Sequence, residues 1–165
     1  MTIMWPKAPV ESHKMDVKEE WRDYNDHLNM AYYNVLFDEA CDRILAKLGL
    51  GAEYLKTRNG SYFTAEAHVC YVRELEIGMP VITRLHLLDL DAKRIRVYQE
   101  LFHAEEGWLS ATSEQLCLHV DMSTRKVVPW PEDILSELTA LQEAQRDLAV
   151  PERAGRGIAI KRRPT

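Results

Sequence analysis

The sequence predicts an α+β domain in which a curved antiparallel sheet wraps around one long helix, with a second helix near the C-terminal end. Two observations predict this arrangement. A long apolar helical stripe begins at residue 30, and four segments with the two-residue period of strands follow it at hairpin spacing. A helix with so broad an apolar face must be buried against something wide, and a sheet provides such a surface.

The long helix has clear start and stop signals. Asn29 is a good N-cap, and Gly49 is placed to close the helix as its C′ residue. Residues 52–58 are expected to add a short helical turn, ended by Asn59-Gly60. The apolar stripe at helical spacing consists of Met30, Tyr33, Phe37, Ala40, Cys41, Ile44 and Leu48.

Strands are predicted over residues 61–75, 81–89, 94–103 and 108–121, in meander order, after a short extended piece at 12–17. Strict alternation in the first strand puts one set on one face (Phe63, Ala65, Ala67, Val69, Tyr71) and a second set on the other (Tyr62, Thr64, Glu66, His68, Cys70). The closing helix is expected over residues 132–149, with Leu135, Leu138, Leu141 and Leu148 on its apolar side. Because a single copy leaves edge strands exposed, edge-to-edge pairing of two copies is expected.

The 165-residue chain fits a single domain, expected over residues 1–150. Residues 151–165 carry five basic side chains and are expected to form a flexible tail. The formal charge is nevertheless −5, so the body is acidic, which argues against nucleic acid as a partner. The sequence shows no membrane-spanning run and no signal-peptide stretch, so we expect a cytoplasmic protein without a membrane partner.

Three cysteines, Cys41, Cys70 and Cys117, each lie inside an apolar periodic segment. Their odd number and their surroundings favour buried thiols of a reducing compartment over disulfides. The sequence has no Cys-x-x-Cys or His-x-x-x-His spacing, so no metal site is expected.

Polar chemistry is concentrated just before the long helix. A carboxylate (Asp23), an imidazole (His27) and a carboxamide (Asn29) lie within seven residues of one another. The first backbone N–H groups of a helix lack intrahelical partners, so this position suits an anion or a developing oxyanion. The backbone N–H groups of Met30 and Ala31 are the expected donors.

The run Asp23-x-x-Asp26-His27-x-Asn29-x-x-x-Tyr33 closely resembles the pattern Asp-x-x-Gly-His-x-Asn-x-x-x-Tyr of hotdog-fold acyl-CoA thioesterases of the 4-hydroxybenzoyl-CoA thioesterase type. The resemblance covers roughly residues 10–140. Its weaker pieces follow in order: His68-x-x-Tyr71-x-x-Glu74-Leu75, Gly78, Asp91-x-Lys93-Arg94, His119-Val120-Asp121 and Pro129-x-Pro131. Within the family, the run from Trp21 to Tyr33 is most similar to the betainyl-CoA thioesterases of carnitine breakdown.

The resemblance implies a hotdog fold and an enzyme that hydrolyses a small acyl-CoA, with betainyl-CoA, giving glycine betaine and CoA, as the leading substrate. Asp23 is implied to be the nucleophile or the general base that activates water. A homodimer or homotetramer is implied, with no cofactor besides the coenzyme A of the substrate. The family's Gly is Asp26 here; Asp tolerates a left-handed backbone, but it adds a second carboxylate beside Asp23.

The remaining candidates have an ordinary explanation beside a functional one. His27 is expected to position the loop, and Asn29 to cap the helix or contact the substrate. The local aromatic residues could hold a trimethylammonium group by cation–π attraction, or pack at a dimer interface. Strand residues could border the acyl site or face solvent, and basic residues could bind CoA phosphates or keep the chain soluble. These candidates are Trp21, Tyr24, Tyr32 and Tyr33 (aromatic), Glu66 and His68 (strand), and Arg73, Lys93 and Arg94 (basic).

Alternative functions remain open at this point: a thioesterase for other short or medium acyl-CoAs, and an acyl-CoA-binding hotdog dimer without turnover. A hotdog dehydratase would carry an Asp and His pair on a loop after the long helix, and no such run is present. A DNA-binding regulator would need an added helix-turn-helix, for which the chain has no room.

Overall fold

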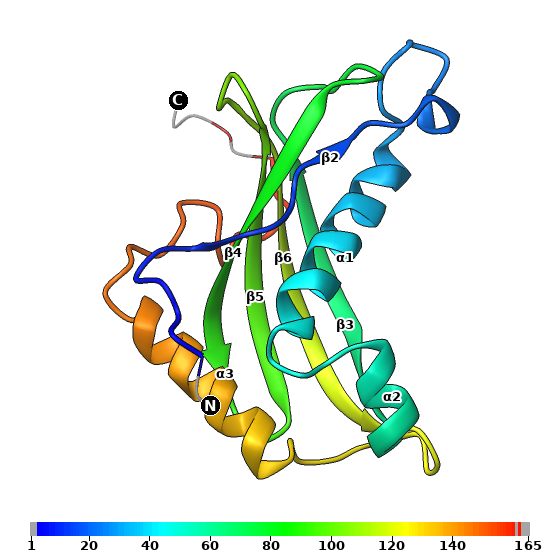
Figure 1. The fold of residues 1–165 in the computed structure, drawn as a ribbon. Coiled ribbons are helices and arrows are strands. Elements are labelled where there is room, and N and C mark those ends of the chain that lie inside the picture. The colour runs from blue at the N-terminus through cyan, green and yellow to red at the C-terminus, as the bar shows by residue number, and fades with distance from the viewer. Residues whose placement is uncertain (1–2, 161, 163–165) are drawn as a thin grey trace.

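The long helix α1 (Met30–Ala46) lies against one face of a curved antiparallel sheet (Figure 1). This computed structural model describes residues 3–160 and 162. The four long strands are β3 (Gly60–Tyr71), β4 (Pro80–Leu90), β5 (Arg94–His103) and β6 (Leu109–Asp121). The predicted α+β class, the long helix and the strands are confirmed, with ends that differ by a few residues.

The strand order is β4-β5-β6-β3, so the expected meander is wrong for β3, which pairs with β6. Residues 72–79 carry the chain from the β3 edge to the β4 edge, across the end of the sheet where α1 begins. This crossing is fixed by two backbone hydrogen bonds, from Leu28 N–H to Leu75 C=O (2.8 Å) and from Gly78 N–H to Val17 C=O (2.8 Å). A sequence pattern identifies strands but carries little information about which distant strands pair.

A β-bulge at Ala65 reverses the alternation of β3. Before the bulge, Thr64 lies opposite the buried Cys117 and faces α1; after it, Ala67 lies opposite the buried Gln115 and faces the same side. The predicted faces are therefore wrong for the first half of the strand, because the extra residue shifts the two-residue period by one. Glu66 and His68 lie on the face of the sheet that points away from α1.

The helix packs its predicted stripe against the sheet, except that Met30 is 65% exposed and that Leu36 and Leu45 are buried as well. Asn29 Oδ1 accepts the N–H of Ala31 (3.0 Å), which confirms the predicted N-cap. At the other end Gly49 has φ +88°, and Leu50 N–H donates to Leu45 C=O (3.2 Å), the pattern of a Schellman C-cap.

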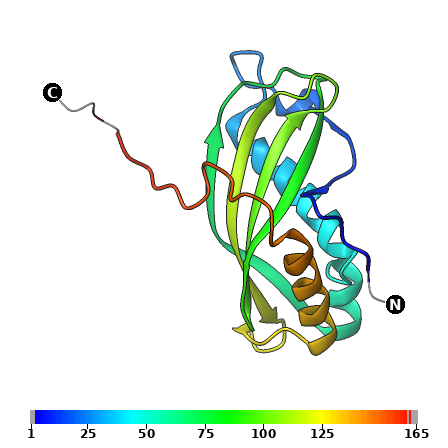
Figure 2. The same ribbon diagram turned by 90° about the vertical axis from the view of Figure 1, so that its left-hand side faces the viewer.

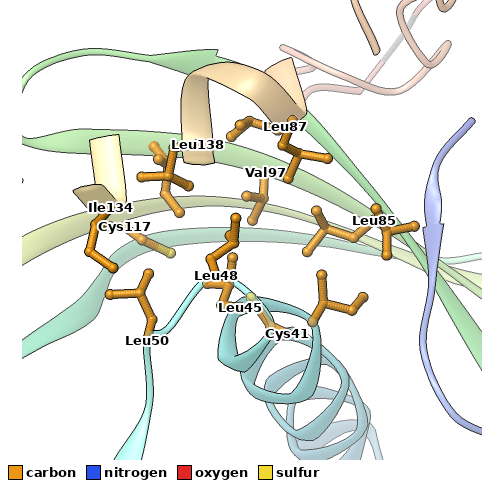
Figure 3. Close-up of a cluster of buried hydrophobic side chains, with 14 of the residues drawn as sticks. Cys41, Leu45, Leu48, Leu50, Leu85, Leu87, Val97, Cys117, Ile134 and Leu138 are labelled. Atoms are coloured by element: carbon orange, nitrogen blue, oxygen red, sulfur yellow. The ribbon is translucent and has the colours of Figure 1, made fainter. Parts of the chain in front are cut away.

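The helix α3 (Glu132–Gln145) contributes Ile134 and Leu138 to the cluster of buried side chains in Figure 3. Its Leu138 and Leu141 pack with Leu85 and Leu87 of β4 and with the C-terminal part of α1. The helix ends at Gln145 rather than at the predicted Ala149. The smaller elements are β1 (Val10–Glu11), β2 (Met15–Asp16), the 3₁₀ turn η1 (Glu19–Trp21), α2 (Ala52–Arg58) and β7 (Lys126–Val127).

The two edges of the sheet differ. The β4 edge is covered by β1 and β2 and by the side chain of Gln145. The Gln145 amide accepts Leu87 N–H (2.8 Å) and donates to Ala8 C=O (3.1 Å) and Leu85 C=O (3.2 Å). The β3 edge has no strand partner within residues 3–160.

Residues 151–160 run over the face of the sheet opposite α1 and past the β3 edge (Figure 2). Gly155 N–H donates to the half-buried Glu114 carboxylate (2.6 Å), so the tail predicted to be flexible begins with a segment attached to the sheet. Lys161 and residues 163–165 lie outside the described residues.

Among the described helices, none combines the length and hydrophobicity of a membrane span. Cys41 and Cys117 are buried, whereas Cys70 is partly exposed.

Replacing Gln145 by Leu tests its role at the β4 edge. The variant leaves one backbone N–H and two carbonyl groups at a buried position without these partners, so we expect the free energy of unfolding to fall by about 3 kcal/mol. Urea denaturation measures the loss. The control is Gln142→Leu on the same helix, where the side chain is partly exposed; a change there of more than about 0.5 kcal/mol would contradict the assignment to Gln145.

Candidate functional site

The loop before α1 is held in one shape by backbone pairing. Arg22 and Leu28 form an antiparallel bridge, and Asn29 N–H donates to Trp21 C=O (2.9 Å). His27 forms a second bridge with Glu76, from the connection that follows β3. These bonds place the loop at the junction of the α1 N-terminus and the end of β3.

Asp23 organises this loop through its carboxylate. One oxygen, Oδ1, accepts the backbone N–H groups of Asn25 (2.7 Å) and His27 (3.2 Å). The other oxygen has no hydrogen-bond partner among the described residues. The carboxylate is therefore fixed in orientation with one oxygen free for chemistry.

Asp26 takes the left-handed backbone that the family's Gly would take, with φ +65°, as the sequence predicts. Its carboxylate pairs with Arg22 (3.0 Å), which also binds Glu19 (2.8 Å). The hydrogen bond from Arg22 lowers the pKa of Glu19. The Asp26 carboxylate is 82% exposed and faces the guanidinium group of Arg22 rather than the site.

The start of α1 offers one free donor. The Met30 N–H has no hydrogen-bond partner among the described residues, whereas the Ala31 N–H is taken by Asn29. The expected pair of oxyanion donors is therefore reduced to Met30 unless the Asn29 side chain moves. Tyr71, at the end of β3, donates its hydroxyl to the Met30 carbonyl (3.1 Å) and ties the strand to the helix start.

These parts enclose a cavity of about 290 Å³. Its walls are Asp23, His27, Leu28, Met30, Tyr33, Tyr71, Val72, Arg73 and Glu74. The rings of Tyr33 and Tyr71 meet edge to face at 5.0 Å, and burial raises the pKa of both phenols. Both hydroxyls are therefore neutral hydrogen-bonding groups at physiological pH.

Arg73 is held in place beside the cavity. Its backbone N–H donates to Ser110 C=O (3.0 Å), and Ser110 Oγ donates to Arg73 C=O (2.8 Å). Its guanidinium lies 3.9 Å from the ring centroid of Trp108. The Arg73 guanidinium is thus held at the cavity, where it can attract an anionic group of a ligand.

The four aromatic residues near Asp23 do not line one common pocket. Trp21 is buried and stacks on Tyr32 (5.6 Å), and Lys18 covers the Trp21 ring at 4.9 Å. Tyr24 is 95% exposed. Of the four aromatic candidates, only Tyr33 lines the cavity.

Other predicted site residues lie elsewhere in the chain. Glu66 and His68 line a separate cavity of about 360 Å³ on the outer face of the sheet, closed by residues 155–158. Lys93 and Arg94 belong to the hairpin at the opposite end of the sheet, where Arg94 pairs with Asp91 (2.6 Å). Within one copy of the chain they do not meet Asp23.

The structure adds Leu28, Tyr71, Val72 and Glu74 to the site. Tyr71 and Glu74 occur in the family-like run His68-x-x-Tyr71-x-x-Glu74, so a signal for them existed in the sequence. Their approach to Asp23 depends on the crossing at residues 72–79, which the sequence pattern does not reveal.

The chain is similar to known proteins along most of its length. Residues 17–138 match the model of the thioesterase-like superfamily. The chain belongs to this superfamily. It is 36% identical over 151 residues to a betainyl-CoA thioesterase of Pseudomonas aeruginosa, covering 92% of this chain and 95% of that protein. It is also 32% identical to an L-carnitine dehydrogenase/betainyl-CoA thioesterase of Rhizobium meliloti. That match covers 96% of this chain but 34% of the longer relative.

Solved structures confirm the hotdog fold of this thioesterase. A Staphylococcus aureus protein solved in complex with CoA has a TM-score of 0.86 at 27% identity, with 98% of this chain and 100% of that chain covered. A 1,4-dihydroxy-2-naphthoyl-CoA thioesterase from Synechocystis has a TM-score of 0.67 at 17% identity, with 86% and 100% covered, and shows the fold alone. The protein is a thioester hydrolase with the α+β architecture predicted from its sequence.

The left-handed turn at Asp26 gives a stability prediction for this thioesterase. Asp26→Gly keeps the backbone conformation and should change the free energy of unfolding by less than about 0.5 kcal/mol. Asp26→Val removes the same ion pair but adds a β-branched side chain at φ +65°, and should cost about 1–2 kcal/mol. Urea denaturation compares the two; equal losses would show that the Arg22 pair, and not the backbone, makes this position sensitive.

Proposed function

We propose that this thioesterase hydrolyses a small acyl-CoA, with betainyl-CoA as the leading substrate. The similarity to betainyl-CoA thioesterases along nearly the whole chain supports this choice of substrate. The observation that carries the mechanism is the free oxygen of Asp23, which lines a cavity at the uncapped Met30 N–H. A carboxylate and an oxyanion donor are the two groups that hydrolysis of a thioester requires.

In the proposed reaction, the free oxygen of Asp23 removes a proton from water as the water attacks the thioester carbonyl, or it attacks the carbonyl itself. In the second case the acyl group is left as an anhydride on Asp23 after the thiolate departs, and water then hydrolyses this anhydride to release the acid and regenerate the carboxylate. The carbonyl oxygen gains negative charge and is received by Met30 N–H at the positive end of the α1 dipole. When the C–S bond breaks, the sulfur leaves as the thiolate of CoA and then takes a proton. The two N–H groups on the other Asp23 oxygen keep the carboxylate aimed at the cavity.

His27 and Asn29 have supporting roles in this proposal. The His27 N–H holds the Asp23 carboxylate, and its side chain forms part of the cavity wall. Asn29 fixes the helix start by capping it, and release of this cap would supply Ala31 as a second oxyanion donor. Arg73 is placed to attract the anionic part of CoA.

The active form is proposed to be a homodimer that pairs through β3. Large apolar side chains are exposed along this edge and the adjoining part of α1: Met30 at 65%, Tyr71 at 46%, Val72 at 45%, Phe63 at 42% and Val35 at 41%. Covering them with a second copy would complete the sheet. Coenzyme A enters as part of the substrate, no further cofactor belongs to the proposed reaction, and a cytoplasmic location is part of the same proposal.

Asp23→Asn tests the mechanism. Asn keeps an oxygen that accepts the two loop N–H groups but cannot accept a proton or act as a carboxylate nucleophile. We expect kcat for betainyl-CoA to fall by about 10²–10⁴-fold while the Kd for CoA is retained. Thiol release on a panel of acyl-CoAs measures turnover, and calorimetry measures CoA binding.

The matched control is Asp26→Asn, which removes the neighbouring carboxylate and should leave turnover nearly unchanged. Unchanged turnover in Asp23→Asn would refute the catalytic role. Binding of CoA without cleavage of any thioester by the wild type would favour the non-catalytic binding dimer. A preference of the wild type for a neutral acyl group would show that betainyl-CoA is not the leading substrate.

A further inference from the structure

A third cavity, of about 610 Å³, lies between the C-terminal half of α1, α2 and the start of β3. It is lined by Asp38, Asp42, Gly51, Ala52, Leu55, Ser61, Tyr62, Phe63 and Thr64. The lining therefore combines two carboxylates with two aromatic rings and contains no basic residue. The mechanism within one copy does not use this cavity.

The two carboxylates lie one helical turn apart and so face the same way. The Tyr62 hydroxyl donates to Asp42, while Asp38 has no hydrogen-bond or ion-pair partner among the described residues. Burial, and secondarily the charge of Asp42, raise the pKa of Asp38. A cation placed between these groups would relieve the repulsion between them.

Within one copy this cavity is remote from Asp23. The helix α1 runs antiparallel to β3, since Tyr71 is bonded to Met30 at one end and Tyr62 to Asp42 at the other. Twelve residues of helix separate Met30 from Asp42, or roughly 18 Å. The nitrogen of a betainyl group is only two bonds from its carbonyl carbon, so one copy cannot use both cavities for one acyl group.

Pairing of two copies through β3 about a two-fold axis would bring the C-terminal end of each β3 strand beside the N-terminal end of the partner's β3. In an antiparallel pair of β3 strands, the end of one strand lies level with the start of the other. In such a dimer the cavity with Asp23 and Tyr71 would lie beside the partner's Tyr62 and the partner's Phe63. The same pairing is the one that the exposed apolar side chains along the β3 edge favour.

We propose that the partner's Asp38 and the partner's Asp42, together with the partner's Tyr62, bind the cationic head of the acyl group and determine the specificity for it. This inference rests on the proposed thioesterase reaction and on its dimer. A trimethylammonium group donates no ordinary hydrogen bonds, so aromatic faces and carboxylate charge are what can recognise it. The aromatic residues beside Asp23 are less suitable, because Lys18 already covers Trp21 and Tyr24 is exposed.

The first test compares betainyl-CoA with 3,3-dimethylbutanoyl-CoA, a neutral isostere in which carbon replaces the quaternary nitrogen. We expect wild-type kcat/KM to favour betainyl-CoA by about tenfold or more. The double variant Asp38→Asn, Asp42→Asn should lose about 10–100-fold on betainyl-CoA and change by less than about threefold on the isostere. The matched control Glu39→Gln, whose carboxylate pairs with His13 (3.3 Å) and Arg43 (3.5 Å), should keep the wild-type preference.

The second test asks whether the carboxylates act across the dimer. Asp23→Asn and the double variant are each prepared, then refolded together so that hybrid dimers form. A hybrid carries one site with wild-type Asp23 and the partner's wild-type Asp38 and Asp42, while its other site carries all the substitutions. Random pairing makes half of the dimers hybrids, so we expect about a quarter of wild-type betainyl-CoA turnover. Sedimentation confirms that each variant is a dimer.

The outcomes separate the two proposals. Equal loss on both substrates in the double variant, or no regain of activity in the mixture, would overturn the inference while leaving the Asp23 mechanism in place. A wild type that cleaves both substrates equally would also overturn it. A wild type that cleaves neither would overturn the proposed substrate as well.

Discussion

Burial of helix α1 against the curved sheet is the constraint on which the rest of this protein depends. Seven residues of the helix are buried, from Tyr33 to Leu45, and the strands β4, β5 and β6 supply the apolar side chains that cover them. Because the helix is fixed along its length, its N-terminus is fixed as well. The free Met30 N–H there is held at one place beside the end of β3.

The loop before α1 uses this fixed end. Backbone bridges join the loop to the connection after β3, and Asp23 uses one carboxylate oxygen to hold the loop while the other stays free. The neighbouring Asp26 could have perturbed this arrangement. Its pairing with Arg22, and its left-handed backbone, keep the turn and direct its charge toward a guanidinium group.

The edges of the sheet explain why one copy is an incomplete enzyme in the proposed function. The β4 edge is closed by β1, β2 and the Gln145 side chain, so the chain cannot extend its sheet there. Within the described residues the β3 edge has no strand partner, and exposed apolar side chains flank it. The proposed pairing would bring the two ends of α1 in different copies together, one with the reactive carboxylate and one with the carboxylate-lined cavity.

The sequence by itself determined the elements, the Asn29 and Gly49 caps, the left-handed turn at Asp26 and the position of Asp23 before the helix. These are local properties, set by side-chain period and by conformational preference within a few residues. Only the tertiary structure decided that β3 pairs with β6, that the bulge at Ala65 reverses the faces of β3, and that Tyr71 and Arg73 line the same cavity as Asp23. It also decided that Trp21 and Tyr32 stack outside the cavity and that Asn29 occupies the Ala31 N–H. The physical reason is that strand pairing and site assembly depend on contacts between segments far apart in the chain, which no local pattern of residues records.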